Sequence, residues 1–291
     1  VYIPIDSMVS VEDDRFSWLK KKPEQKGLHR IRASRLRGTL SLGILVPTEE
    51  GMSVGDEVSH LFGITVYEAP ELLHAGEMER DPGFLPVYDI ESLRKWGDEV
   101  LVPGEEVVLT EKIHGANGRF AFHRDRLWCG SRTTFKKEGT GSMWWEVAER
   151  YKLAERMAVV CPGIALYGEV YGQVQDLKYG QRGADLMIFD AYEIVQHRWL
   201  DDSELEVLIE MLNNSYAGPE ISMCPVLYRG PWAWENVAHL AEGDSVVAAM
   251  NGEQHVREGF VLKPVKERYD LNLGRVILKL HGAGYLTRKG G

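Results

Sequence analysis

The chain has 291 residues, of which 44% are hydrophobic and 27% are charged, a balance typical of a soluble globular protein with one large or two ordinary domains. Its formal net charge of -10 argues against a protein that coats nucleic acid, although a local basic patch can lie within an acidic total. No apolar run is long enough to span a membrane, and no signal peptide opens the chain.

The three cysteines, Cys129, Cys161 and Cys224, are odd in number and form no CxxC pair. This pattern argues against a disulfide framework and against a zinc site, and it favours a reducing compartment. We therefore expect an intracellular, cytoplasmic protein. Nothing in the sequence indicates an obligate oligomer, so we expect a monomer.

The first unit is predicted to run over residues 1–72 and to consist of short strands. Alternating apolar and polar residues predict strands within 1–5, 30–33 and 38–46, and residues 56–62 are predicted to form a short helix. Short strands with a basic face are typical of a small β-barrel such as an OB-fold. The first residue is Val1 rather than Met, which is compatible with a module trimmed at its N-terminus.

A basic segment lies between positions 20 and 37, where Glu24 is the only acid. One interpretation is an ordinary solvated face, and the other is a surface that follows nucleic-acid phosphates. Within this segment the candidates for RNA binding are Arg30, Arg32, Arg35 and Arg37. The sequence signals after the first unit are weak, and we predict a linker over residues 73–86.

The second unit is predicted over residues 87–291 as a strand-rich α+β domain rather than a series of βαβ units. Helices are expected where apolar residues recur at helical spacing, at 90–96, 143–158 and 202–212. Strands are expected on both sides of a turn within 107–122, and also at 164–170, 186–194, 259–263 and 276–280.

The stretch EKIHGAN, from Glu111 to Asn117, follows an apolar run and places Lys112 and His114 beside a turn. A lysine amine is protonated near neutral pH and must lose its proton to act as a nucleophile. If Lys112 attacks the α-phosphorus of a nucleotide, the product is a phosphoramidate and pyrophosphate leaves. Taken alone, Lys112 is more simply a surface lysine, but Gly115 suits a turn that lets backbone approach a ligand.

Segments further along the chain supply the charges that such a reaction needs. Glu258 precedes one predicted apolar strand, Lys263 ends it, and Lys279 has a similar place in the last predicted strand. Glu169 lies inside an apolar strand, where a carboxylate costs free energy unless it binds a hydrated metal or a ribose. Each of these residues alone is also explained as a strand-end lysine or a salt-bridged glutamate.

Two further residues have more than one interpretation. Arg132 follows a small turn, from which it could contact phosphate or sugar. Phe189 could stack on a base or belong to the core, and the sequence leaves both interpretations open. No G-x-S-x-G, H-E-x-x-H or G-x-x-x-x-G-K-[ST] pattern occurs, which argues against serine-hydrolase, zinc-protease and P-loop functions.

Six segments resemble, in order and spacing, the motifs of the covalent nucleotidyltransferase superfamily of polynucleotide ligases and mRNA-capping enzymes. They are EKIHGAN at 111–117, SR at 131–132, LYGEVYG at 166–172, LMIFD at 186–190, REGFVLKP at 257–264 and VILKL at 276–280. EKIHGAN and EGFVLKP are similar to the phage T4 RNA ligase 2 branch. The N-terminal unit is instead similar to the Deinococcus and Naegleria type of RNA ligase, which carries an OB module before the transferase domain.

The resemblance implies an OB-like β-barrel followed by an ATP-grasp-like ligase domain with antiparallel sheets. It also implies an ATP-dependent RNA ligase that requires Mg²⁺ or Mn²⁺. In such an enzyme Lys112 would take AMP from ATP, the AMP would move to a 5′-phosphate RNA end, and a 3′-hydroxyl would then seal the break. The expected substrate is a nick in duplex RNA or in an RNA/DNA hybrid.

The resemblance also assigns roles to residues by position. Those implied to bind ATP are Glu111, which would contact adenine, Phe189, which would stack on it, and Asn117, Arg132, Glu169 and Glu258. Glu169 and Glu258 would hold the metal through water. Lys263 and Lys279 would neutralise the α-phosphate, while His114, Asn117 and Arg132 would act around the phosphates and in the later steps.

One departure and two alternatives are left open. Many relatives carry two lysines as K-x-K in the last motif, and here Ile277 occupies the earlier place, which leaves Arg275 or the metal to assist pyrophosphate departure. The alternatives are a GTP-dependent capping-type guanylyltransferase and a non-catalytic RNA-binding scaffold. A capping enzyme would be expected to carry its OB module after the transferase domain, whereas little chain follows Lys279.

Overall fold

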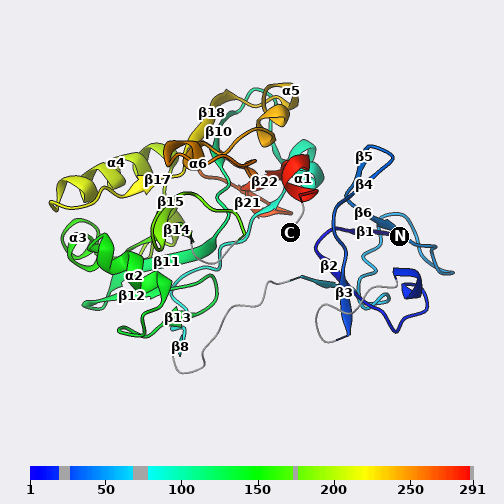
Figure 1. Ribbon diagram of the computed structural model, residues 1–291, viewed down its shortest axis with the longest axis horizontal. Coiled ribbons are helices and arrows are strands. Elements are labelled where there is room, and N and C mark those ends of the chain that lie inside the picture. The colour runs from blue at the N-terminus through cyan, green and yellow to red at the C-terminus, as the bar shows by residue number, and fades with distance from the viewer. Residues whose placement is uncertain (20–26, 68–77, 173–175, 289–291) are drawn as a thin grey trace. The chain divides into compact units, whose positions relative to one another are not determined.

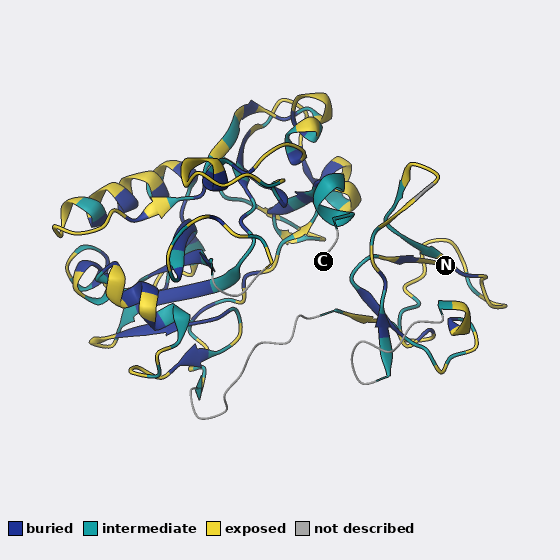
Figure 2. Cartoon of the chain, viewed as in Figure 1, coloured by how far each residue is buried: buried dark blue, intermediate teal, exposed yellow. Residues whose placement is uncertain are grey.

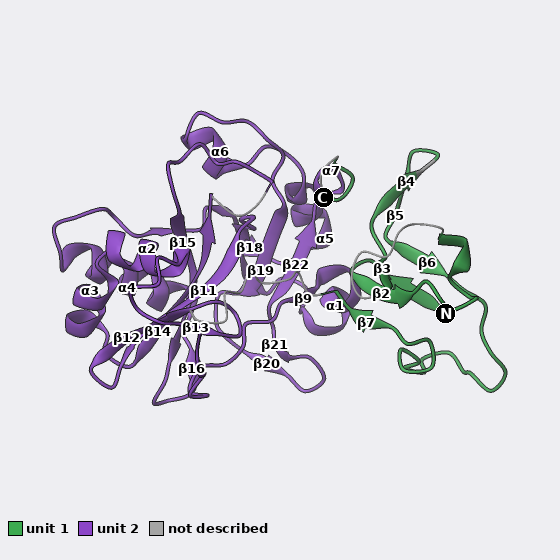
Figure 3. Cartoon of the chain, turned by 60° about the horizontal axis from the view of Figure 1, so that its bottom comes forward, with its two compact units in different colours: residues 1–72, 286–289, 291 green, residues 73–285, 290 purple. Residues whose placement is uncertain are grey.

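The computed structural model describes residues 1–19, 27–67, 78–172 and 176–288, and it divides into two compact units (Figure 3). The first unit is formed mainly by residues 1–72 and the second by residues 73–285. Residues 73–77 of the predicted linker lie outside the described residues. Among the described residues, no helix is long and apolar enough to cross a membrane.

The described part of the first unit contains three small antiparallel sheets (Figure 1). Their paired strands are β1 (Tyr2–Pro4) with β6 (Gly43–Leu45), β4 (Ser34–Leu36) with β5 (Thr39–Ser41), and β2 (Ser7–Ser10) with both β3 (Leu28–Arg30) and β7 (Thr65–Val66). A 3-10 turn spans Ser17–Leu19. The described strands form no closed barrel, so the OB-fold stays a prediction.

The core of this unit is a small apolar cluster, made by Ile3, Val9, Phe16, Ile31, Val46 and Phe62. The short helix predicted at 56–62 is wrong, because residues 59–62 form turns and residues 56–58 have no regular secondary structure. Phe62 is buried and Val58 packs against the same core, whereas Leu61 is 49% exposed.

Two larger sheets organise the second unit. The five-stranded sheet has the order β18 (Val226–Pro231), β10 (Glu106–Glu111), β19 (Gly259–Pro264), β22 (Leu278–His281) and β9 (Glu91–Ser92). The eight-stranded sheet has the order β16 (Arg198–Trp199), β15 (Asp185–Glu193), β14 (Ile164–Tyr171), β11 (Ala116–His123), β12 (Arg126–Gly130), β13 (Phe135–Lys136) and β8 (Met78–Glu79), with β17 (Ser222–Met223) beside β15. A separate hairpin joins β20 (Tyr269–Asp270) and β21 (Gly274–Arg275).

Among the described strands of these two sheets, β9–β22 and β15–β17 pair in parallel and the other pairs are antiparallel. The expectation of a mixed α+β domain with antiparallel sheets is therefore confirmed. The strands predicted from alternation at 164–170, 186–194 and 259–263 correspond to β14, β15 and β19 within one or two residues.

Helices cover the outer face of each sheet. Helices α2 (Met143–Arg150), α3 (Leu153–Val160) and α4 (Asp202–Asn214) share one apolar cluster with β11, β12, β14 and β15, and α1 (Leu93–Val100) packs on the five-stranded sheet. The shorter helices are α5 (Trp234–Val237), α6 (Val246–Met250), α7 (Ala283–Leu286) and the 3-10 turn Ala238–Ala241. The single helix predicted at 143–158 is divided in two, because Lys152 has a φ of +51°, which no helix interior accepts.

Two further apolar clusters lie on the other face of the eight-stranded sheet. One includes Val261 of β19, and the other includes Ile113, which follows β10, so both lie toward the five-stranded sheet. Figure 2 shows the long strands of this unit as mostly buried. Polar side chains within such an interior must find partners or bind a ligand. The residues singled out by the sequence motifs lie on these strands or directly beside their ends.

Candidate active site

Three strands bring Lys112, Glu169 and Glu258 together. Lys112 directly follows β10, and its backbone N–H donates to the carbonyl of Gly259 at 3.0 Å. This pairing places the start of β19 beside Lys112, so Glu258 Oε1 lies 2.7 Å from Lys112 Nζ. Glu169 lies on β14, and its Oε1 accepts a hydrogen bond from the Gly115 N–H at 3.0 Å.

The turn after Lys112 requires a glycine. A Cβ atom on Gly115 would lie 2.4 Å from the backbone oxygen of Val170, closer than real Cβ contacts allow. The motif glycine therefore lets the turn approach β14, and this close approach delivers Glu169 to Lys112.

Two histidines hold Glu258 from its other sides. His114 Nδ1 lies 3.1 Å from Glu258 Oε2, and His281 Nε2 lies 3.3 Å from Glu258 Oε1. The other ring nitrogen of His114, Nε2, lies 2.9 Å from Asp176 Oδ1. The Tyr285 hydroxyl is 2.9 Å from His114 Nδ1, and its ring stacks on His281 with centroids 5.9 Å apart.

Of these residues, sequence reasoning identified His114 and missed His281, Tyr285 and Asp176. His281 lies two residues after Lys279 on β22, so strand alternation places both side chains on one face of the sheet. Such alternation was the one signal available for His281. Nothing in the sequence indicates that Tyr285 in α7 returns to His114.

Burial and charge shift the pKa of the three central groups. Burial opposes the charged form of Lys112, but the carboxylates of Glu258 and Glu169 outweigh it and raise the pKa of the amine. Burial would also raise the pKa of Glu258, yet Lys112 and hydrogen bonds from His114 and His281 hold it well below its usual range. Burial raises the pKa of Glu169 to about 7, against the opposing effect of Lys112.

Glu111 has a buried oxygen with no partner among the described residues. Its side chain is 1% exposed, and Oε2 accepts a hydrogen bond from the Val246 N–H at the start of α6 at 2.8 Å. Its Oε1 has no hydrogen-bond partner. A buried carboxylate oxygen in this condition is suited to accept a hydrogen bond from a ligand N–H. Oδ1 of Asn117 is likewise buried without a hydrogen-bond partner.

Phe189 lies on β15 and is partly buried against both clusters between the sheets. Its ring centroid is 4.8 Å from that of Tyr88. The two interpretations of Phe189 are therefore compatible, since one edge packs in the interior while part of the side chain stays accessible.

The structure does not bring all the predicted cations to Lys112. Lys263 Nζ instead lies 3.1 Å from Asp190 Oδ1 and 3.6 Å from Glu267 Oε1. Lys279 pairs with Val261 in the register of β19 and β22, one strand away from Lys112, and it influences the nearby His281 electrostatically. Arg132 follows β12 and forms an ion pair with Asp89.

Comparison with known proteins decides the family. A family model described as RNA ligase matches residues 105–281. The chain belongs to the RNA ligase family. None of the curated protein sequences with which it was compared matches it.

Solved structures of Naegleria gruberi RNA ligase share this fold. A ligand-free variant is 26% identical, with a TM-score of 0.83 over 98% of this chain and 84% of that chain. A variant with ATP and Mn is 25% identical, with a TM-score of 0.81 over 98% of this chain and 85% of that one. The enzyme with pyrophosphate is 25% identical, with the same TM-score of 0.81 and the same coverage of 98% and 85%.

In this RNA ligase the arginines predicted to bind RNA differ in their surroundings. Arg30 donates through Nε to Asp6 Oδ1 at 2.9 Å, and its guanidinium lies 3.8 Å from the centroid of the Tyr67 ring. Arg32, Arg35 and Arg37 are exposed. The lysines at positions 20, 21, 22 and 26 lie outside the described residues.

No three His, Cys, Asp or Glu side chains of the described residues are grouped to hold a metal ion directly. The acids predicted to hold a metal through water, Glu169 and Glu258, face the same amine of Lys112. All three cysteines of this RNA ligase are free and buried.

Proposed function

We propose that the chain is an ATP-dependent RNA ligase that joins 3′-hydroxyl and 5′-phosphate RNA ends through lysyl-AMP and RNA-adenylate intermediates. The observation that carries the proposal is the meeting of Lys112, Glu169 and Glu258, with Lys112 Nζ 2.7 Å from a Glu258 oxygen. Membership of the RNA ligase family supports RNA as the substrate. The Naegleria gruberi structures with ATP and Mn and with pyrophosphate support ATP as the nucleotide.

The first step joins Lys112 Nζ to the α-phosphorus of ATP and breaks the bond from that phosphorus to the bridging oxygen, so pyrophosphate leaves. The amine must first lose a proton, which the carboxylates of Glu258 and Glu169 hold on it in the free protein. AMP then passes to the 5′-phosphate of RNA, and attack by the 3′-hydroxyl releases AMP and forms the phosphodiester.

The acids around Lys112 fit a hydrated Mg²⁺ or Mn²⁺. Glu169 and Glu258 are two carboxylates beside a single lysine, and burial raises the pKa of Glu169 to about 7, so a nearby cation would favour its charged form. A divalent cation bound through water at Glu169 and Glu258 would neutralise both acids and the charge that develops on the α-phosphate.

At the adenine base, Glu111 Oε1 would accept a hydrogen bond from the amino group, and its lack of a partner among the described residues supports this role. Phe189 would stack on the ring. Asn117, Arg132, His114 and Lys279 would contact the phosphates or act in the transfer to RNA and in sealing. The Asp89 carboxylate that pairs with Arg132 would be exchanged for phosphate.

We further propose that residues 1–72 are an OB-type nucleic-acid-binding module and that the substrate is a nick in duplex RNA or an RNA/DNA hybrid. The exposed Arg32, Arg35 and Arg37 support this role, because phosphate contacts dominate nucleic-acid affinity. Arg30 would contribute mainly by ordering the segment, since Asp6 and Tyr67 already engage it.

The Lys112→Ala variant tests the chemistry. It should not seal a nick with a 5′-phosphate when ATP is supplied, because no lysyl-AMP can form. It should still seal a nick that carries a pre-adenylylated 5′ end, since that end is already activated. Sealing of both substrates is followed on denaturing gels with a labelled RNA strand.

Lys137→Ala is the matched control, because Lys137 is an exposed lysine of the same domain and should seal both substrates like the parent chain. A folded Lys112→Ala variant that fails on the pre-adenylylated nick as well would contradict the role given to Lys112.

A further inference from the structure

Strand β15 carries an extra residue at the place where Phe189 lies. Tyr167 of β14 pairs with Asp190 and the next residue, Gly168, pairs with Ile188, so Phe189 has no partner in β14. Ile188 packs into the cluster beneath α2, α3 and α4, whereas Phe189 packs between the two sheets. Because the extra residue interrupts alternation, the Asp190 side chain points to the inner side as well.

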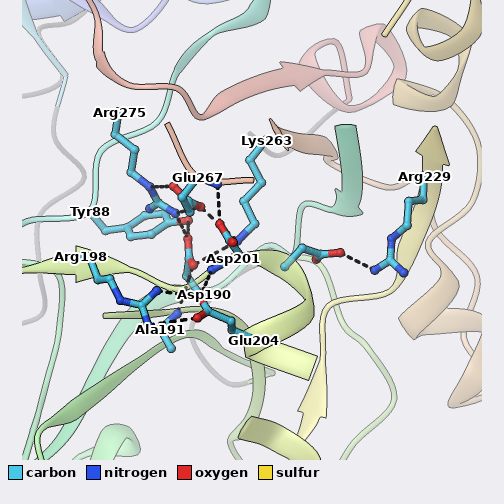
Figure 4. Close-up of polar contacts among 11 residues, drawn as sticks. Tyr88, Asp190, Ala191, Arg198, Asp201, Glu204, Arg229, Lys263, Glu267 and Arg275 are labelled. Atoms are coloured by element: carbon cyan, nitrogen blue, oxygen red, sulfur yellow. Dashed lines mark hydrogen bonds and ion pairs between the residues drawn. The ribbon is translucent and has the colours of Figure 1, made fainter. Parts of the chain in front are cut away.

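Asp190 is completely buried and is held from three directions (Figure 4). Lys263 Nζ donates to Oδ1 at 3.1 Å, the Tyr88 hydroxyl donates to Oδ2 at 2.8 Å, and Arg275 Nη2 donates to Oδ2. Burial opposes ionisation of Asp190, but Arg275 and Lys263 overcome it and lower the pKa of the carboxyl. The bulge in β15 is therefore fastened to the opposite sheet.

Glu267 completes the network. Arg275 donates to its two oxygens through Nη2 at 2.6 Å and through Nε at 2.9 Å, and Lys263 Nζ lies 3.6 Å from its Oε1. The two negative charges of Asp190 and Glu267 thus balance the positive charges of Lys263 and Arg275. Removing one member would leave a buried charge without its partner, which is costly.

The place of Lys263 argues against contact with the α-phosphate. Gly259 pairs with Lys112 and Lys263 lies four residues further along β19, which corresponds to about 13 Å of extended strand. The amine of Lys263 also has two acidic partners at Asp190 and Glu267. The positive charge of Lys263 is therefore already neutralised by two carboxylates of the protein.

We propose that Lys263 and Asp190 are positioning residues for the nucleotide base: they fix the bulge in β15 so that Phe189 is presented for stacking. The inference rests on the proposed function, because it takes adenine as the partner of Phe189. Tyr88 contributes to the same task, since it donates to Asp190 and its ring packs against Phe189.

Comparing the binding of adenosine with that of AMP distinguishes a positioning role of Lys263 from a direct phosphate contact. The two ligands differ only by the α-phosphate, and neither can form lysyl-AMP. Their binding is measured by isothermal titration calorimetry with the parent chain, Lys263→Met and Tyr88→Phe. Lys266→Met is the control, since Lys266 is three residues away and its side chain is 80% exposed. Thermal unfolding followed by circular dichroism checks that each variant is folded.

Lys263→Met should weaken the binding of adenosine and of AMP by the same factor, roughly tenfold, which matches the loss of one aromatic stacking contact. Tyr88→Phe, which keeps the ring and removes a single hydrogen bond, should weaken both ligands by a smaller common factor. A loss confined to AMP would identify Lys263 as a phosphate contact and overturn the inference, as would unchanged binding of both ligands. If the parent chain binds neither ligand, the proposed function itself fails.

Discussion

At the scale of single residues, the free protein holds Lys112, the proposed nucleophile, in the protonated form, which cannot attack a phosphorus atom. The same carboxylates that would attract a metal and a nucleotide raise the pKa of Lys112, with Glu258 contributing more than Glu169. Activation therefore depends on a ligand that takes over those negative charges. In the proposed mechanism, loss of the Lys112 proton is therefore coupled to binding of the nucleotide and the metal.

Glu111→Gln tests the recognition of the base. In the parent chain Oε2 accepts from the Val246 N–H and Oε1 has no partner. Glutamine can keep the bond to Val246 only by turning its NH₂ toward the pocket, where it would oppose the adenine amino group. Label transfer from ATP should fall by about tenfold or more, the cost of a buried polar group left unsatisfied. The ratio of the rate of label transfer from ATP to the rate from GTP should also become smaller.

Rates of label transfer from ATP and GTP labelled at the α-phosphorus measure both effects. Glu106→Gln is the control, because Glu106 lies on the same strand and is exposed. An unchanged rate and preference in Glu111→Gln would remove Glu111 from the base site.

The motif residues could be predicted from sequence because short segments on neighbouring strands carry them. Lys112, Glu169 and Glu258 meet as expected, since each lies beside or within a strand of the interior. His114 was identified from its motif, but the contacts of His281 with Glu258 and of Tyr285 with His114 could not be predicted, because they arise from tertiary packing. The partners of Lys263 were missed for the same reason, since Asp190 comes from the other sheet.

At the scale of elements, the alternation of apolar and polar residues correctly located the long buried strands. The features that were not predicted depend on the local conformation of the backbone. The interruption between α2 and α3 depends on the positive φ of Lys152, a residue with no sequence preference for that conformation. The bulge in β15 could not be predicted from the sequence LMIFD either. It arises because Tyr167 pairs with Asp190 while the next residue, Gly168, pairs with Ile188.

The carboxylate in β14 should make the stability of the protein depend on pH. The folded pKa of Glu169, about 7, lies above the ordinary value of 4.5, so between these pH values the folded chain keeps a proton that the unfolded chain has released. Stability linked to this group is therefore fully present below about pH 4.5 and is lost as the pH rises through 7. In Glu169→Gln the side chain cannot ionise, so this loss of stability at high pH does not occur.

We expect Glu169→Gln to be more stable than the parent at pH 8 by about 1–2 kcal/mol, an amount reduced because the side chain is only partly buried. The difference should vanish near pH 4.5, and label transfer should be lost at every pH. Urea unfolding at several pH values measures this, with Glu210→Gln as an exposed control on α4. A variant less stable than the parent at pH 8 would show that ionised Glu169 stabilises the fold.

At the scale of the whole molecule, the chain combines a ligase-type domain with a separate small unit, and the two were distinguishable in the sequence by composition and strand length. The larger unit was the more predictable, because its motifs lie on long strands with strong alternation. The smaller unit was harder to predict, since its strands have only two to four residues and give weak patterns.

The role proposed for the smaller unit predicts a change in RNA binding. Reversing charge in Arg35→Glu/Arg37→Glu should weaken binding of a nicked duplex several-fold at low salt and make the affinity less dependent on salt concentration. Electrophoretic mobility shifts at several salt concentrations measure both effects. Arg124→Glu/Lys137→Glu changes the net charge equally at exposed positions of the larger unit, and a similar loss in this control would leave no special role for Arg35 and Arg37.

The central claim is that Lys112 becomes covalently adenylylated, and transfer of label to the protein tests it most directly. The chain is mixed with Mg²⁺ or Mn²⁺ and with ATP or GTP labelled at the α-phosphorus, and the products are separated on a denaturing gel. We expect label from ATP that survives denaturation in the parent chain and is absent in Lys112→Ala. Label from GTP alone, or no label in a folded protein that was free of AMP at the start, would contradict it.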